Sequence, residues 1–175
     1  MPKQNDYIET IGLLTKDLEA QGFHPTLVGG MALVIMGSQR VTNDFDFLVS
    51  RQDLLVEQVI EVFYKHGFEL ISKFNERREV LRTIENPQVA KVRLGMDSPE
   101  SAYFYNHQSE LKIDLLFDFP IPAKEVASRA LKIKVKSHSW RVASREDLIR
   151  LKEIAYADRR LASDATDLEF LRSLS

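Results

Sequence analysis

The sequence predicts a mixed α/β (α+β) fold, in which one mixed β-sheet carries flanking helices and the chain ends in a helical segment. The opening of the chain alternates helical and strand-like patterns, the middle holds several strand-like runs, and the end shows capped helical patterns. No repeat, linker or low-complexity segment interrupts the chain. We therefore expect a single domain over residues 1–175, with the C-terminal helices at about 144–175.

The N-terminal part predicts helix, strand, short helix and strand in that order. Apolar residues at helical spacing predict a helix over about 5–21, which ends at Gly22. The apolar run 26–28 predicts a short strand, followed by a tight turn and a compact buried helix at 31–36. Residues 44–49 alternate acidic and apolar residues before becoming wholly apolar. This pattern is typical of a strand with one end at solvent and the other in the core.

The middle and the end continue with further strands and helices. Ser50 and Asp53 form a capping-box pattern before a helix that ends near Gly67, and Ser144 opens a second capping pattern. Two helices are expected after Ser144, at about 145–158 and 164–171. Lysines alternate with apolar residues in one further predicted strand, as in an edge strand that discourages pairing with other chains. The strands predicted after Gly67 are 69–71, 79–84, 89–94, 111–117 and 132–136.

Composition and charge exclude several classes of function. The chain has 24 Lys and Arg against 26 Asp and Glu, so its net charge of −2 cannot hold a polyanion or an anionic membrane by overall charge. Because it has no Cys, disulfides, thiolate metal sites and Cys nucleophiles are excluded. Its start has no signal-peptide pattern, and no run reaches the ~20 apolar residues of a membrane span. We expect a cytoplasmic protein without a membrane partner.

The chemically informative stretch is Gly29-Gly30, then thirteen residues, then Asp44-Phe45-Asp46. Residues two apart on a strand face the same side, so Asp44 and Asp46 are expected to project together. Paired carboxylates suit Mg²⁺, which is commonly held by one or two carboxylates together with substrate phosphates. Glycines without side chains let backbone N–H groups approach an anion. The stretch predicts metal binding at the acids and phosphate binding at the glycines.

A third acid is expected from a neighbouring strand, where Asp114 lies between apolar residues. Asp118 is its alternative, four residues further on. Three carboxylates can hold two metal ions, one activating an attacking hydroxyl and one stabilising the leaving group. The alternative for Asp44 and Asp46 is a solvated strand end that pairs with Arg40, and for the glycines an ordinary turn.

Other residues near these motifs also allow two interpretations. Lys152 contacts phosphate or is a surface lysine on a helix. In the metal-free protein the three acids are expected to be unoccupied or to be bridged by water and Arg40. Tyr103, Phe104 and Tyr105 could stack on a base, but aromatic residues in strands are more typical of the core.

The order of these motifs resembles the DNA polymerase β-like nucleotidyltransferase superfamily. The stretch GGMALVIMGSQRVTNDFDFLV is similar to small bacterial minimal nucleotidyltransferases and to the AbiEii group found in toxin–antitoxin pairs. Further matches to these groups are Gly37, Arg40 and Thr42, and the C-terminal pattern Ser144, Glu146-Asp147-Leu148, Lys152, Asp164 and Asp167.

The resemblance implies a nucleotidyltransferase fold and a metal-dependent enzyme that moves a nucleoside monophosphate from a nucleoside triphosphate to a hydroxyl group. The acceptor is left open between a protein, an RNA and a small molecule, and a toxin–antitoxin partner is possible. The alternatives are a catalytically silent antitoxin or partner-binding module, and a nucleotide sensor. The implied site has Asp44, Asp46 and Asp114 as catalytic residues and ligands of two Mg²⁺ ions, with Gly29, Gly30, Arg40 and Lys152 binding the nucleotide.

Overall fold

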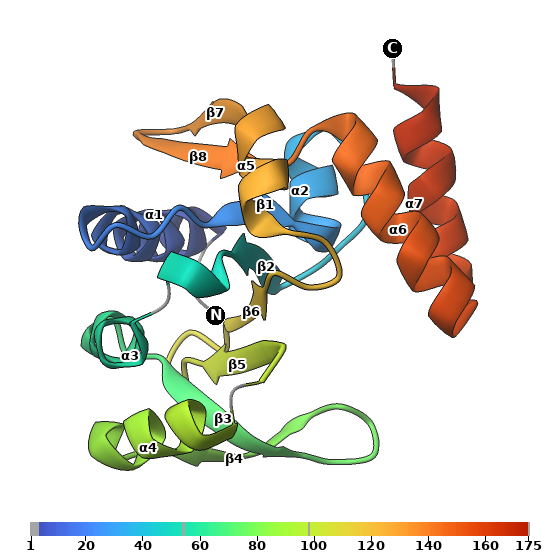
Figure 1. The fold of residues 1–175 in the computed structure, drawn as a ribbon. Helices are drawn as coiled ribbons and strands as arrows, with labels where there is room; N and C mark the ends of the chain where they lie inside the picture. Colours follow the sequence, from blue (N-terminus) through green and yellow to red (C-terminus); the bar gives the residue numbers. More distant parts are fainter. Residues whose placement is uncertain (1–3, 54, 98, 175) are drawn as a thin grey trace.

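An eight-stranded mixed sheet forms the centre of the protein, in the strand order β4-β3-β5-β6-β2-β1-β8-β7 (Figure 1). The computed structural model describes residues 4–53, 55–97 and 99–174. The β2–β6 and β1–β8 pairs are parallel, and the other neighbouring strands are antiparallel. The strands are β1 (Thr26–Val28), β2 (Asp44–Val49), β3 (Glu69–Phe74), β4 (Val80–Ile84), β5 (Ser101–Tyr105), β6 (Lys112–Phe117), β7 (Leu131–Val135) and β8 (His138–Val142).

Helices flank the sheet on two sides. Figure 1 shows α1, α3 and α4 along one side, while α6 and α7 form a helical pair beyond the other. None of the helices in the described ranges is long and apolar enough to cross a membrane. The helices are α1 (Gln4–Ala20), α2 (Gly29–Ile35), α3 (Val56–Lys65), α4 (Pro87–Asp97), α5 (Ala123–Arg129), α6 (Arg145–Arg159) and α7 (Ala162–Ser173), with a 3-10 turn at Arg51–Asp53.

Alternation along β2 separates the core from the chemically active face. Phe45 and Phe47 are buried at 2% exposure, whereas Asp46 points to the opposite side of the strand. The core below the sheet is strongly aromatic, since the Phe63 ring of α3 stacks on Phe104 of β5 with centroids 4.0 Å apart. Phe104 is therefore a core residue, as its position in a strand predicts.

The prediction of a strand at 89–94 is wrong, because this segment lies in α4. Asn86 and Pro87 carry the missed signal: the Asn86 side chain accepts a hydrogen bond from Gln88 N, and proline occupies the first helical position. Ala90 and Leu94, four residues apart, are the buried side of the helix. The apolar residues therefore follow the helical period, not strand alternation.

The predicted capping box at Ser50 and Asp53 is also wrong, since α3 begins later, at Val56, with no side-chain cap. A carboxylate oxygen of Asp118 instead accepts a hydrogen bond from Arg51 N and holds the 3-10 turn. Several short elements were not predicted at all, namely β5, α5 and β8. The remaining predicted helices and strands are confirmed, with β7 at a sheet edge.

The second capping pattern is confirmed at the start of α6. The Ser144 Oγ accepts a hydrogen bond from Asp147 N at 3.1 Å and satisfies a donor that the first turn of the helix leaves free. Apolar residues then hold the helical pair together and against the sheet, with Leu148 and Leu171 almost fully buried.

Replacing this cap tests its contribution. We expect Ser144→Ala to lower the free energy of unfolding by about 1 kcal/mol, because the freed N–H loses its partner. Urea denaturation measures the change. Ser163→Ala, at an exposed position of α7, is the control and should change stability by less than about 0.5 kcal/mol. Equal losses in the two variants would contradict a capping role.

Candidate active site

The centre of the candidate site is a pair of carboxyl groups from neighbouring parallel strands. Asp46 of β2 stands opposite Asp114 of β6 in the strand register, so their side chains lie on the same face of the sheet. The two side chains are hydrogen-bonded to each other. Because an ionised carboxylate can only accept, this contact requires one of the two groups to carry a proton.

Burial raises the pKa of both acids, and neighbouring carboxylates add to the shift of each. Burial, followed by the nearby charge of Asp46, raises the pKa of Asp114 to about 8. Burial also raises the pKa of Asp46, with the charge of Asp44 acting in the same direction. Asp114 Oδ1 is buried and has no hydrogen-bond partner. The pair therefore retains a proton near neutral pH, and within the described residues Asp114 Oδ1 accepts no hydrogen bond.

Lys112 supplies positive charge beside the acids and was not among the predicted site residues. Its Nζ lies 3.7 Å from Asp44 Oδ2 and 3.6 Å from Asp114 Oδ1, and the side chain is 17% exposed. The signal was present in the sequence, because Lys112 precedes Asp114 by two residues in the same strand and so shares its face. Lys112 lies between the acids, whereas Arg40 pairs with Asp167, so the expected Arg40 bridge is wrong.

The two glycines lie against charged side chains. Gly29 has a φ of 69°, which L residues rarely adopt, and a methyl group there would overlap Asp46 Oδ2. A methyl group at Gly30 would lie 2.9 Å from Arg40 Cζ. The structure thus brings Gly29 beside the acid pair and Gly30 beside Arg40, as expected of a compact turn that joins β1 to α2.

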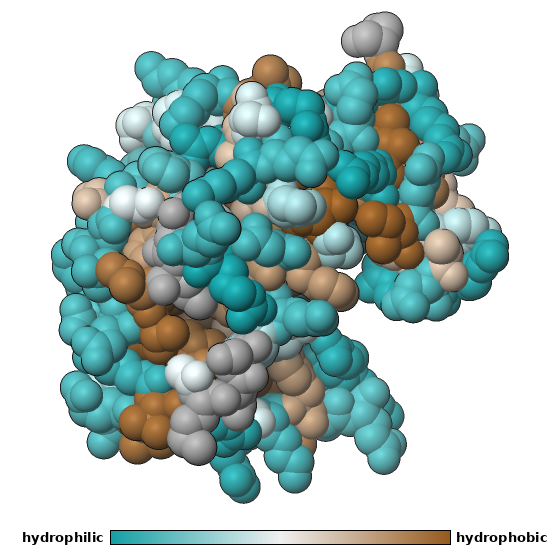
Figure 2. All heavy atoms as spheres, in the orientation of Figure 1, coloured by the Kyte–Doolittle hydropathy of each residue, from teal (hydrophilic) through white to brown (hydrophobic). Residues whose placement is uncertain are grey.

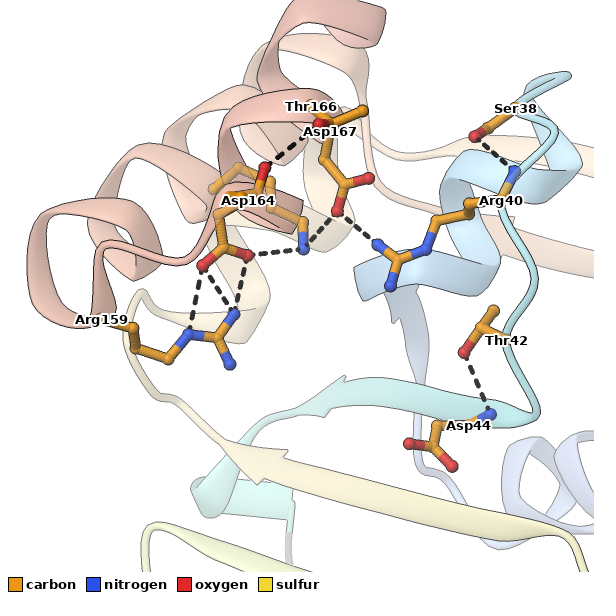
Figure 3. A network of polar contacts seen from close by, with 10 residues as sticks. Ser38, Arg40, Thr42, Asp44, Arg159, Asp164, Thr166 and Asp167 are labelled. Atoms are coloured by element: carbon orange, nitrogen blue, oxygen red, sulfur yellow. Dashed lines mark hydrogen bonds and ion pairs between the residues drawn. The ribbon is translucent and has the colours of Figure 1, made fainter. Parts of the chain in front are cut away.

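A second charged network ties the C-terminal helices to the loop before β2 (Figure 3). Buried Asp167 pairs with the Arg40 guanidinium and with Lys152 Nζ, the latter at 2.9 Å. Buried Asp164 pairs with Lys152 at 3.3 Å and with Arg159 at 2.8 Å. Three cations thus share two carboxylates. Lys152 is 13% exposed, so the alternative of a surface lysine is wrong.

The loop that carries Arg40 is shaped by short polar side chains. Ser38 Oγ accepts a hydrogen bond from Arg40 N at 3.2 Å, and Thr42 Oγ1 accepts one from Asp44 N at 3.3 Å (Figure 3). These contacts resemble those of ordinary polar turns. They bring the Arg40 guanidinium and the Asp44 carboxylate to the same region of the protein.

Asp118 has a structural position and is not part of the acid pair. It follows β6 with a φ of 53°, and its two oxygens accept hydrogen bonds from Arg51 N at 2.9 Å and from Ala123 N at 2.8 Å. Both oxygens are thus occupied in holding the turn before α5. Of the two candidates for the third acid, only Asp114 contacts Asp46.

The surface around these groups is hollowed between the C-terminal helices and the β3–β4 hairpin (Figure 2). Across the parts of the chain that the structure describes, no three carboxylate or imidazole groups form a ready metal cluster. A separate cavity of about 500 Å³ lies between α1 and the β7–β8 hairpin, lined partly by Phe47 and Trp140. That cavity is on the opposite face of the sheet from Asp46.

Gly29 offers a direct test of the close packing at the acid pair. We expect Gly29→Ala to lower the free energy of unfolding by about 2–4 kcal/mol, from backbone strain together with overlap at Asp46. Gly37→Ala is the matched control, since Gly37 also has a positive φ but open space around it. It should lose only about 1–2 kcal/mol. Chemical denaturation measures the free energy of unfolding of both variants. Equal losses of stability would contradict the close packing of Gly29 against Asp46.

The raised pKa of Asp114 predicts how stability depends on pH without divalent ions. The native state keeps a proton that the unfolded chain has already released, so stability falls as pH rises from about 4 to about 8. The expected loss is on the order of a few kcal/mol. Asp114→Asn should flatten this slope, whereas Asp158→Asn, at an exposed position, should leave it unchanged. Urea denaturation at pH 5 and pH 8 measures the dependence of stability on pH. If this dependence is unchanged in Asp114→Asn, the pKa of Asp114 is not raised in the folded protein.

Comparison with known proteins gives a family match over most of the chain. Residues 13–174 match a family described as the nucleotidyl transferase AbiEii toxin of type IV toxin–antitoxin systems. No curated protein matches the chain at a significant level.

Solved structures share the fold at low sequence identity. An antigenic nucleotidyltransferase-like protein from Paracoccidioides brasiliensis has a TM-score of 0.60 and 12% identity, over 96% of this chain and 76% of the other. The lincosamide antibiotic adenylyltransferase LnuA, with lincomycin bound, has a TM-score of 0.58 and 12% identity, over 95% and 97%. ANT(2'')-Ia, in complex with adenylyl-2''-tobramycin, has a TM-score of 0.60 and 9% identity, over 95% and 87%. With a nucleotidyltransferase fold and a family match along nearly its whole length, the chain belongs to the AbiEii nucleotidyltransferase toxin family.

Proposed function

We propose that this nucleotidyltransferase moves a nucleoside monophosphate from a nucleoside triphosphate to an acceptor hydroxyl, with dependence on a divalent metal ion. The observation that carries the proposal is the hydrogen-bonded pair of Asp46 and Asp114 beside the side-chain-free turn at Gly29. A carboxyl pair and a turn that lets an anion approach the backbone are the two parts that such a transfer requires.

The nucleotide is proposed to lie on the side of the acids formed by α2 and the C-terminal helices. The missing side chains of Gly29 and Gly30 let the Asp46 carboxylate and the Arg40 guanidinium approach the turn closely. Arg40 and Lys152 would provide the positive charge for the phosphates there. Asp167 contacts both cations and so fixes their positions before a ligand arrives. Preorganised cations favour a triphosphate more than mobile ones, since less side-chain entropy is lost on binding.

The acids suit a magnesium site by their chemistry. Asp114 Oδ1 is buried without a hydrogen bond, with Lys112 Nζ 3.6 Å away, and Asp46 shares a proton with Asp114 that a divalent cation would displace. Asp44, Asp46 and Asp114 would hold the metal. The resemblance to polymerase β-like enzymes implies that two ions are bound. The ions would neutralise the charge that develops on the phosphates and lower the pKa of the acceptor hydroxyl.

The transfer itself is proposed as one displacement at phosphorus. The acceptor oxygen forms a bond to the α-phosphorus, the bond from that phosphorus to the bridging oxygen breaks, and pyrophosphate leaves with its electron pair. Asp114 would take the proton from the acceptor hydroxyl once a bound divalent cation has displaced the proton of the pair and left its carboxylate ionised. Arg40 and Lys152 would stabilise the charge on the departing pyrophosphate.

The family places the protein in a toxin–antitoxin context. We propose that it acts as an enzyme of such a pair, with an antitoxin as its protein partner. The proximity of Asp46 to Asp114, and of Arg40 and Lys152 to Asp167, supports this proposal. A catalytically silent member would not need two buried carboxyl groups in contact or cations held beside them. Both arrangements lower the stability of the folded protein, so they are expected where catalysis requires them.

Asp46→Asn tests the proposed function. The variant should fold, and its melting temperature should equal or exceed that of the wild type, because like-charge repulsion is relieved. Mg²⁺ with a nucleoside triphosphate should stabilise the wild type but stabilise Asp46→Asn much less, and pyrophosphate release should fall by at least about 100-fold.

Thermal melts and a radiolabelled pyrophosphate assay give the two measurements, with Asp158→Asn as the control that keeps both responses. If Asp46→Asn melts far lower and the wild type gains nothing from the ligands, Asp46 is a structural residue and the proposal fails.

A further inference from the structure

The flank of the acid pair that faces away from α2 carries an unassigned group of aromatic and basic residues. In the sheet order, β5, β3 and β4 lie beyond β6, whereas α2 packs on β1 and β2 on the other side. If the nucleotide lies at Gly29 and Gly30, the acceptor must approach from β5 and the β3–β4 hairpin. The inference below rests in this respect on the proposed function.

Two aromatic rings cover the first part of this flank. Tyr103 of β5 stands opposite Asp114 in the antiparallel register, so it shares the face of the acids. Phe74 of β3 meets the Tyr103 ring edge to face, with centroids 5.3 Å apart. A bulge in the pairing of β3 with β4 near Lys73 turns Phe74 toward this face, although Leu70 on the same strand faces the core opposite Phe104.

Two cations sit over these rings. The Arg78 Cζ lies 5.1 Å from the Phe74 centroid and 5.9 Å from that of Tyr103. Lys112 Nζ lies 5.5 Å and 5.7 Å from the same two centroids. Both are within the range of cation–π attraction, which holds a cation without using its hydrogen-bond donors. We call Phe74, Tyr103, Arg78 and Lys112 the cation–aromatic pad.

The donors of Arg78 are unused. Over the ranges that the structure describes, its guanidinium makes no hydrogen bond and no ion pair, although other arginines, such as Arg129 and Arg141, pair with acids. The hairpin turn fixes its position, since Asn75 Oδ1 accepts hydrogen bonds from Arg77 N and Glu79 N. Between residues 73 and 82 four basic residues outnumber two acidic ones, so the surroundings of Arg78 favour an anion.

We propose that the cation–aromatic pad binds a phosphate group of the acceptor, so that the enzyme modifies a phosphate-bearing acceptor rather than a cationic one. The guanidinium of Arg78 matches phosphate oxygens in a bidentate contact, and Lys112 extends the positive charge from Arg78 to the acids. The neighbouring rings provide a flat apolar edge for a base or sugar attached to that phosphate. A polycationic acceptor is repelled by the same residues.

The experiment measures equilibrium binding of four probes to the full chain by calorimetry. The probes are a short single-stranded oligonucleotide, the same sequence with an uncharged methylphosphonate backbone, cytidine monophosphate, and tobramycin as a cationic acceptor. Each is measured with and without Mg²⁺ and a non-transferable nucleoside triphosphate analogue. The oligonucleotide and the monophosphate distinguish a phosphodiester chain from a small phosphate monoester as the source of the phosphate.

The variants are Arg78→Ala and Arg77→Ala, which remove the same charge from adjacent exposed positions of one turn. We expect Arg78→Ala to weaken binding of the charged probes by about tenfold or more, since a charge-assisted contact is lost. Arg77→Ala should change it by less than about twofold. The uncharged oligonucleotide and tobramycin should bind weakly to every variant.

Three results would overturn the proposal: equal weakening by the two variants, no binding of either charged phosphate probe to the wild type, or tighter binding of tobramycin than of both. Failure of the proposed function is seen separately. Stabilisation of the wild type by Mg²⁺ and the triphosphate analogue reports the nucleotide side, and Arg78→Ala should keep it.

Discussion

Contact between two buried carboxyl groups, one on each of two parallel strands, is the constraint on which the rest of the site depends. Asp46 and Asp114 meet because β2 and β6 pair in register, and their contact is tolerable only if a proton or a cation compensates their charge. Position 29 requires glycine, because the backbone there has a positive φ and a side chain would overlap Asp46. The register, the turn and the charges around the pair are therefore linked requirements.

Positive charge reaches the site from two sides in different ways. Lys112 comes from β6, the strand that carries Asp114, and is held by the acids and by two rings. Arg40 and Lys152 come from a loop and a helix and are held by Asp167 on α7. Each group of cations has its own carboxylates, so the acid pair does not draw Arg40 away from the region of the glycines. This separation keeps the phosphate side and the acid side chemically distinct.

The sequence allowed the acids to be predicted but not most of their partners. Alternation in residues 44–49 and the apolar neighbours of Asp114 are local signals, and both point to the correct face. Arg40 and Asp167 are 127 residues apart, and no local pattern links them. The short apolar run at 89–94 fits the strand period as well as the helical period, so it predicts a strand where the structure has α4. The Asn-Pro sequence at its start is the signal for a helix. The bulge that turns Phe74 depends on pairing with β4, which a single strand does not encode.

The position of α7 in the chain also has a consequence for biosynthesis. A ribosome makes α7 after every strand of the sheet, so the carboxyl pair can form before Asp164 and Asp167 exist. Until then Arg40, Lys152 and Arg159 lack the two buried acids that hold them in the folded protein. In the nascent protein the carboxyl pair can therefore form before Arg40 and Lys152 are held in place by α7. The chemistry that requires both is withheld until the helical pair has packed.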